Sequence, residues 1–115
     1  MGHGKKRKTA NESLLDAVRQ GDFDAVRYYI EDQGADVEAR DQRNRTALHI
    51  ATEHGFTLCI EALIDLGARI DPTDHQKATP LMLAAERGLT ETVNLLLANG
   101  ADIMLKNAKG QTAFH

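Results

Sequence analysis

The chain has 115 residues, a formal net charge of −3 and a hydrophobic fraction of 42%, values that are ordinary for one small soluble domain. Aromatic residues make up only 4% and tryptophan is absent, so a core built around large rings is not expected. The negative charge argues against a nucleic-acid partner, because contacts with the phosphate backbone need a clear positive surface.

Three features of the sequence bear on the compartment in which the protein is expected. A single cysteine, Cys59, excludes an internal disulfide framework and is typical of a reducing compartment. No apolar run reaches the roughly 20 residues that span a bilayer, and the basic N-terminus is not followed by the apolar stretch of a signal peptide. We therefore expect an intracellular protein, cytoplasmic, nuclear or both, with no membrane partner.

The first ten residues carry a basic cluster and are predicted to be a disordered tail, residues 1–10. Three interpretations of this cluster remain open: a nuclear import signal, a weak anion-binding arm, or a solvated tail with no further role. Its members are Lys5, Lys6, Arg7 and Lys8.

The rest of the chain is periodic. Thr46, Thr79 and Thr112 are equally spaced along the sequence, and Gly67 and Gly100 have the same spacing. In the first unit the interval is longer by one residue, which we place between Gly21 and Gly34. A fixed period of about 33 residues predicts a solenoid of stacked units. The expected repeats are residues 11–44, 45–77 and 78–110, with the start of a truncated fourth at 111–115.

Each unit reads as a pair of short helices. In the third unit, Thr79 is a good helix N-cap and Pro80 suits the first helical position, where its missing N–H costs nothing. Gly88 ends that helix as a residue free to take a positive φ. Leu89, Val93, Leu96 and Leu97 then recur at helical spacing. Because each pair has more apolar surface than it can cover itself, the units are expected to stack.

These motifs carry a family resemblance. The segments Thr46-Ala47-Leu48-His49-Ile50-Ala51 and Thr79-Pro80-Leu81-Met82-Leu83-Ala84 match one signature, and Gly34-Ala35-Asp36-Val37-Glu38, Gly67-Ala68-Arg69-Ile70-Asp71 and Gly100-Ala101-Asp102-Ile103-Met104 match a second. The chain resembles the ankyrin repeat family over residues 11 to 115. The resemblance implies an all-α solenoid of stacked helix pairs with β-hairpin fingers.

Departures from the family pattern lead to further expectations. Lys77 stands where the other finger turns have Asn44 and Gly110, both of which tolerate a positive φ better. Met82 replaces the usual histidine, so the hydrogen bond of that histidine is expected to be missing in the third unit. The final "QTAFH" is expected to begin a further repeat in a longer array; the alternative is that it folds over as an incomplete cap.

Nothing in the sequence favours catalysis, a cofactor, a metal or a small-molecule substrate. Ser13 is the only serine, and Cys59 is expected to be a small, semi-buried packing residue. His49 and His54 do not have the spacing of a helical zinc site, and the resemblance gives His49 a structural hydrogen bond.

The resemblance also implies a partner protein, bound by the finger tips and by the ends of the first helices. The three arginines of the first finger are expected to be replaceable together with little loss of stability. The predicted partner-binding residues are Arg40, Gln42, Arg43, Arg45, Glu53, His54, Thr73, His75, Gln76, Glu86, Arg87, Lys106 and Lys109.

Two alternatives accompany this prediction. The array could be the targeting or substrate-recruiting part of a larger enzyme or ubiquitin ligase, which the full reading frame would reveal. It could also read methylated lysine in chromatin, which needs an aromatic cage. Tyr28 and Tyr29 are expected to face the core, and the fingers have no aromatic residue. Recognition of methylated lysine is therefore ranked last of the three functions.

Overall fold

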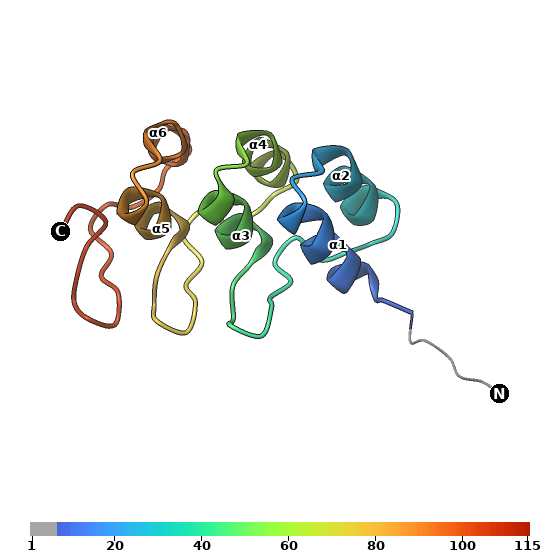
Figure 1. Ribbon diagram of the computed structural model, residues 1–115, viewed down its shortest axis with the longest axis horizontal. Helices are drawn as coiled ribbons and strands as arrows, with labels where there is room; N and C mark the ends of the chain where they lie inside the picture. Colours follow the sequence, from blue (N-terminus) through green and yellow to red (C-terminus); the bar gives the residue numbers. More distant parts are fainter. Residues whose placement is uncertain (1–6) are drawn as a thin grey trace.

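The computed structural model describes residues 7–115, and this part of the chain is an elongated stack of three helix pairs (Figure 1). The first helices of the pairs form one layer and the second helices form the other, while three loops extend from the side of the first helices. The stack measures 55 × 26 × 20 Å. The helices are α1 (Ala10–Arg19), α2 (Phe23–Glu31), α3 (Ala47–His54), α4 (Thr57–Asp65), α5 (Pro80–Glu86) and α6 (Thr90–Ala98).

The ends of α5 confirm the sequence prediction. The Thr79 hydroxyl accepts a hydrogen bond from the backbone N–H of Met82, Pro80 is the first helical residue, and Gly88 has a φ of 68°. At the other end of the array, α1 begins at Ala10, in the segment predicted to be the tail. Its N-cap is Thr9, which forms a reciprocal capping box with Glu12.

The additional residue of the first repeat lies in the turn that ends α2. In the later repeats the amide of Ala68 donates to the carbonyl of Leu63, and that of Ala101 donates to Leu96, five residues back in each case. In the first repeat the corresponding bond runs from Ala35 to Tyr29, six residues back. This placement between Gly21 and Gly34 was predicted, and the wider turn leaves the following repeat in register.

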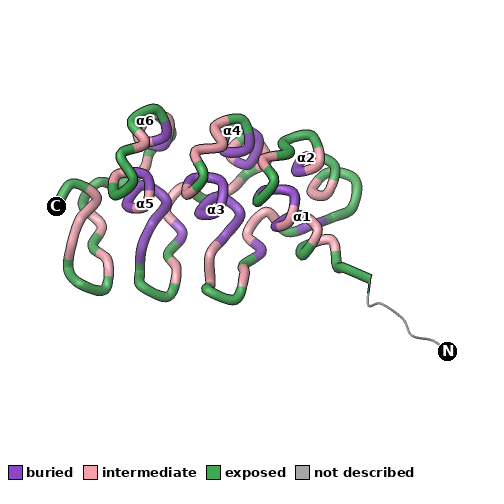
Figure 2. The backbone as a smooth tube through the Cα atoms, in the orientation of Figure 1, coloured by how far each residue is buried: buried purple, intermediate pink, exposed green. Residues whose placement is uncertain are grey.

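The core consists mainly of small and aliphatic residues. Figure 2 shows that buried segments occur along the whole stack. Leu14, Leu48, Leu63 and Leu81 are fully enclosed or nearly so, at 0–1% exposure. Tyr28 is a correction to the sequence analysis, because it is 48% exposed and does not face the core. Apolar burial on this scale is the main stabilising term of a solenoid, since each unit covers its neighbour.

A recurring contact joins each repeat to the one before it. Phe56 occupies the N-cap position of α4 without making a capping bond, and its ring packs over Gly21 of the first repeat. Leu89 has the same position before α6 and packs over Gly55. A Cβ at position 21 would lie 3.2 Å from the Phe56 ring, and the φ of +70° there also favours glycine. At the starts of α4 and α6, the N-cap side chain therefore packs against the preceding repeat and makes no capping hydrogen bond.

The β-hairpin form that was expected for the fingers is not confirmed. The described residues form no β-strand, only one isolated bridge between Arg40 and Thr46. Each finger is closed by one backbone bond, as from the amide of Asp41 to the carbonyl of Arg45 at 2.9 Å. It is also closed by one side chain that accepts two backbone amides, as Asp41 does from Arg43 and Arg45. Asp74 and Asn107 have the same role in the other fingers. These side-chain bonds occupy amides that a strand pairing would use.

The last five residues form a turn. The residues of "QTAFH" do not start a helix; the amide of His115 donates to the carbonyl of Thr112 and closes a turn. Ala113 packs against the core, while Phe114 is 57% exposed.

Lys77 has the positive φ that its sequence position predicts. Its φ is 58°, beside 61° at Asn44 and 76° at Gly110. Lysine loses stability in this left-handed conformation, so Lys77→Gly is expected to raise the free energy of unfolding by roughly 0.5–1 kcal/mol. Chemical denaturation would measure the change. Gln76→Gly, which alters a neighbouring exposed residue without a positive φ, should lower stability instead.

Candidate functional site: the fingers and the adjoining groove

The fingers are residues 40–45 (finger one), 73–78 (finger two) and 106–111 (finger three). His49 of α3 fixes the position of finger two. Its Nδ1 accepts from the Thr46 amide at 3.1 Å, so the proton lies on Nε2, which donates to the carbonyl of Ala78 at 2.8 Å. The ring is fully buried, and this burial lowers the pKa of His49 although the bond to Ala78 opposes the shift. The structural role implied by the family resemblance is therefore confirmed.

This lowered pKa predicts a loss of stability in mild acid. Below the ordinary histidine pKa of 6.5 the unfolded chain takes up a proton at His49 while the folded chain resists it. The contribution of His49 is thus complete above about pH 6.5 and decreases as the pH falls below that value, by at most about 1.4 kcal/mol per pH unit. Denaturant unfolding at pH 7.5 and pH 5.5 would measure it. His49→Leu should lose this part of the pH dependence, and an identical dependence in that variant would contradict the assignment.

Repeat three has methionine at the equivalent position. The sulfur of Met82 lies 3.5 Å from the amide of Thr79, so the local contact within the helix cap is kept. Within residues 7–115, no hydrogen bond joins the side chain of Met82 to finger three. The expected loss is therefore limited to the bond between helix and finger.

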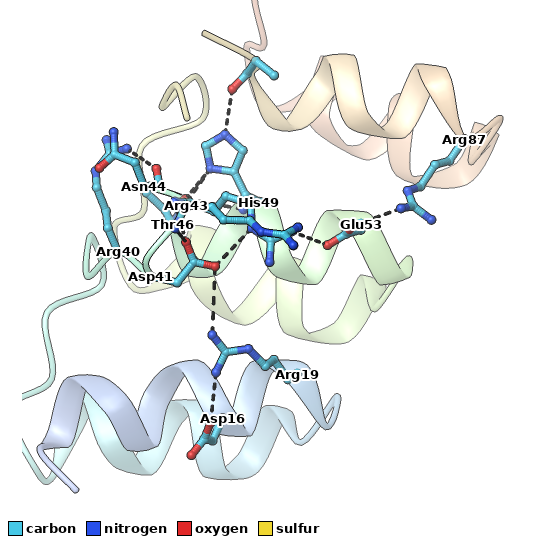
Figure 3. A network of polar contacts seen from close by, with 12 residues as sticks. Asp16, Arg19, Arg40, Asp41, Arg43, Asn44, Thr46, His49, Glu53 and Arg87 are labelled. Atoms are coloured by element: carbon cyan, nitrogen blue, oxygen red, sulfur yellow. Dashed lines mark hydrogen bonds and ion pairs between the residues drawn. The ribbon is translucent and has the colours of Figure 1, made fainter. Parts of the chain in front are cut away.

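Charged side chains on the first helices and finger one form a network across all three repeats (Figure 3). Arg45 bonds to Asp41 at 3.1 Å and to Glu53 at 2.5 Å, and Glu53 also accepts from Arg87 at 2.9 Å. Arg19 of α1 lies 2.9 Å from Asp16 and 4.0 Å from Asp41. The network lines a groove between α1, α3 and finger one.

In the middle of this network, Asp41 and Arg45 are partly buried, and their charged forms depend on their bonding partners. Burial by itself would raise the pKa of Asp41, but the hydrogen bonds from Arg45 and from the amide of Arg43 outweigh it and lower the pKa. For Arg45, burial opposes the charge, whereas the bonds to Asp41 and Glu53 raise its pKa. Removing one of these charged side chains would leave its bonding partners with a partly buried charge that no opposite charge compensates.

Arg40 is also part of the fold. Its Nη1 donates to the carbonyls of Asn44 at 2.8 Å and Thr73 at 2.7 Å, which ties finger one to finger two. Among the three arginines of finger one, only the side chain of Arg43 makes no bond within residues 7–115. The triple replacement by alanine would therefore remove structural contacts of Arg40 and Arg45, and it cannot leave stability unchanged as the sequence analysis expected.

Backbone bonds place the finger tips side by side. The amide of His75 donates to the carbonyl of Arg43 at 3.4 Å, and the amide of Ala108 donates to Gln76 at 2.8 Å. The remaining predicted finger residues are exposed, and within residues 7–115 their side chains make no hydrogen bond or ion pair. They are Gln42, Arg43, Thr73, His75, Gln76, Lys106 and Lys109.

The helix ends contribute two further exposed residues from the predicted set. Glu86 ends α5 without a side-chain bond in the described part of the chain. The ring of His54 stacks on Phe56 with 5.2 Å between ring centres. Glu53 and Arg87, by contrast, pair with each other, so the structure brings together a fixed groove and a row of free finger residues.

A model of ankyrin repeats in three copies matches residues 14–107. The chain belongs to the ankyrin repeat family. Arrays of this family are generally protein-interaction modules and typically non-catalytic. No curated protein matches the chain.

The ankyrin array has few features that resemble a reactive site. Cys59 is fully buried, more so than predicted, and burial raises its pKa to about 11 with a smaller contribution from the charge of Asp22. A buried thiol in this state is a packing residue. In residues 7–115 no group of three His, Cys, Asp or Glu side chains is arranged to hold a metal ion, and no helix is long and apolar enough to cross a membrane.

The basic tail is described only in part. Lys5 and Lys6 lie outside the described residues. Arg7 is exposed, and Lys8 forms an ion pair with Asp16 of α1. The side chain of Asp16 thus connects the end of the tail to the charged network of the groove.

Proposed function

We propose that this ankyrin array is a non-catalytic module that binds a partner protein through its finger tips and the concave ends of its first helices. The observation that carries the proposal is the contrast between the two surfaces. Most groove charges satisfy one another, whereas the finger tips, together with Glu86 at the end of α5, carry exposed polar side chains that make no hydrogen bond or ion pair within residues 7–115. Side chains that do not serve the fold are available for a partner.

Equivalent positions in the three fingers allow a test that leaves the fold intact. Arg43, Gln76 and Lys109 occupy the same position in successive repeats, are exposed, and make no side-chain bond in the described chain. Replacing all three with alanine should change stability by no more than about 0.5 kcal/mol per site. The matched control replaces Glu61 and Asn94 with alanine, since these exposed residues of α4 and α6 are also equivalent to each other.

Affinity capture from a cell lysate with quantitative mass spectrometry would compare the two variants with the unmodified chain. Proteins bound through the fingers should be lost from the finger variant and retained by the helix variant. Loss from the helix variant alone would move the binding surface to the second helices and overturn the proposal. Equal melting temperatures in both variants would show that the comparison reports binding.

A further inference from the structure

The fingers have a charge that differs from that of the whole chain. Residues 40–45, 73–78 and 106–111 contain six lysine or arginine residues and two aspartates, although the chain has a net charge of −3. Both aspartates are occupied: Asp41 and Asp74 each accept two backbone amides that close their own finger. The charge that remains directed to solvent is therefore positive.

Four of the six cations are free to bind a ligand. Arg40 and Arg45 are tied into the fold, as described above. The other four are exposed, and no hydrogen bond or ion pair of their side chains occurs in residues 7–115: Arg43, Lys77, Lys106 and Lys109. Because backbone bonds join neighbouring tips, these cations lie along one row.

Lys77 provides an independent observation. It holds a left-handed conformation, with a φ of 58°, at a position that the other fingers give to asparagine and glycine. Its side chain makes no bond within the described chain that would offset the strain. Strained residues persist where they serve function, and the property that Lys77 adds over glycine is its charge.

Building on the proposed function, we propose that the finger row binds an acidic, extended segment of the partner protein, and that Lys77 is present for its charge. Each finger is two chains wide, about 10 Å at the usual spacing of hydrogen-bonded chains, and an extended chain covers the same distance in about three residues. A segment that crosses the fingers therefore meets one finger at every third residue. The matching ligand has an acidic side chain at every third position.

The adjoining groove favours a protein segment over a nucleic acid. On the first helices beside the fingers, Asp16 and Glu53 already pair with the cations around them, and Glu86 is an exposed carboxylate without a bond in residues 7–115. The groove therefore offers a continuous phosphate backbone little unpaired positive charge. The fingers also contain no aromatic side chain on which bases could stack. A peptide avoids both difficulties, because its acidic residues can be confined to the finger row.

Chemical-shift titration of the full chain in low salt tests the proposal, since this method detects weak binding. The probe is a synthetic peptide with glutamate at every third position, separated by glycine and serine. Controls replace every glutamate with glutamine or gather the same glutamates into one block. The spaced peptide should shift the amides of Arg43, Lys77 and Lys109 and bind at least about threefold more tightly than the block. Added salt should weaken it.

Two variants separate charge from stability. Lys77→Gly should raise the melting temperature and yet weaken binding of the spaced peptide, by about threefold. Gly110→Lys should do the reverse, because position 110 has a φ of 76° and open space around it. Unchanged affinity in both variants would overturn the role of Lys77.

Other outcomes overturn the choice of ligand. Equal binding of the glutamine peptide would exclude charge recognition, and equal binding of the block would exclude the three-residue spacing. Tighter binding of oligothymidylate than of the spaced peptide would make the row a nucleic-acid site. Any of these results could occur while the alanine variant of Arg43, Gln76 and Lys109 still loses its captured proteins. In that case the proposal of an acidic segment is overturned, and the proposed protein-binding function is still supported.

Discussion

Amides of α6 are expected to exchange with solvent at least about tenfold faster than amides of α4. Helix α4 buries Cys59, Ile60, Ala62 and Leu63, whereas α6 buries only Thr92 and Leu96. Helix α4 also packs against α2 and α3, while α6 packs chiefly against α5. A difference of even one fully buried aliphatic side chain, about 1.5 kcal/mol, corresponds to more than a tenfold difference in local opening.

Hydrogen exchange followed by mass spectrometry or NMR would measure the two helices in one sample. The relevant segments are Thr57–Asp65 and Thr90–Ala98. As a control, a designed capping repeat joined after His115 should slow exchange in α6 and leave α2 unchanged, since each repeat interacts only with its neighbours. Equal protection of α4 and α6 would mean that contacts with α5 are sufficient to hold the third repeat.

Replacing His49 with leucine is expected to lower the free energy of unfolding by about 2–3 kcal/mol. The substitution fills the site with an apolar side chain of similar size but removes the bond to Ala78 and leaves the buried amide of Thr46 without its acceptor. A lost hydrogen bond costs about 1 kcal/mol, and an unsatisfied buried group costs about 1–3 kcal/mol. Urea unfolding at neutral pH would give the value.

Met82→Leu is the matched control, because Met82 has the same position one repeat later. Its sulfur is only a weak acceptor for the Thr79 amide and, within the described chain, makes no bond to finger three, so the substitution should cost less than about 1.5 kcal/mol. Equal losses at positions 49 and 82 would contradict the importance of the bond between α3 and finger two.

The repeating parts of the fold were predictable because they depend on local rules. The intervals between threonines and glycines located the helix pairs, and the additional residue of the first repeat lies where the glycine spacing placed it. The positive φ of Lys77 followed from the glycine and asparagine at equivalent positions. In each case one residue's conformation or one helix end is set by neighbours within a few positions.

Several local features were missed although the sequence contained a signal. Thr9 and Glu12 have the spacing of a capping box, which marks the start of α1. Asp41, Asp74 and Asn107 recur once in every repeat and are typical residues for side-chain turns. These residues indicate that a side chain helps to close each finger, which the sequence analysis did not include.

The groove network could not be predicted in this way. Glu53 pairs with Arg45 of its own repeat and with Arg87 of the next, and no periodic rule selects either partner, since the repeat equivalent of Glu53 is Glu86. Which cation reaches which carboxylate depends on the curvature of the stack and on side-chain rotamers. For this reason the sequence assigned Arg40, Arg45, Glu53 and Arg87 to a partner, whereas the structure engages all four within the array.

The contact of Phe56 over Gly21, repeated by Leu89 over Gly55, bears on how such a chain could evolve. Both junctions between repeats use one arrangement, a bulky apolar residue over a glycine of the preceding unit. A gene duplication that copies one whole unit would therefore create a junction that already fits, without compensating substitutions elsewhere. Insertion of part of a unit would instead set the bulky residue against a side chain. Selection at these paired positions thus allows the number of repeats to change while their spacing is maintained.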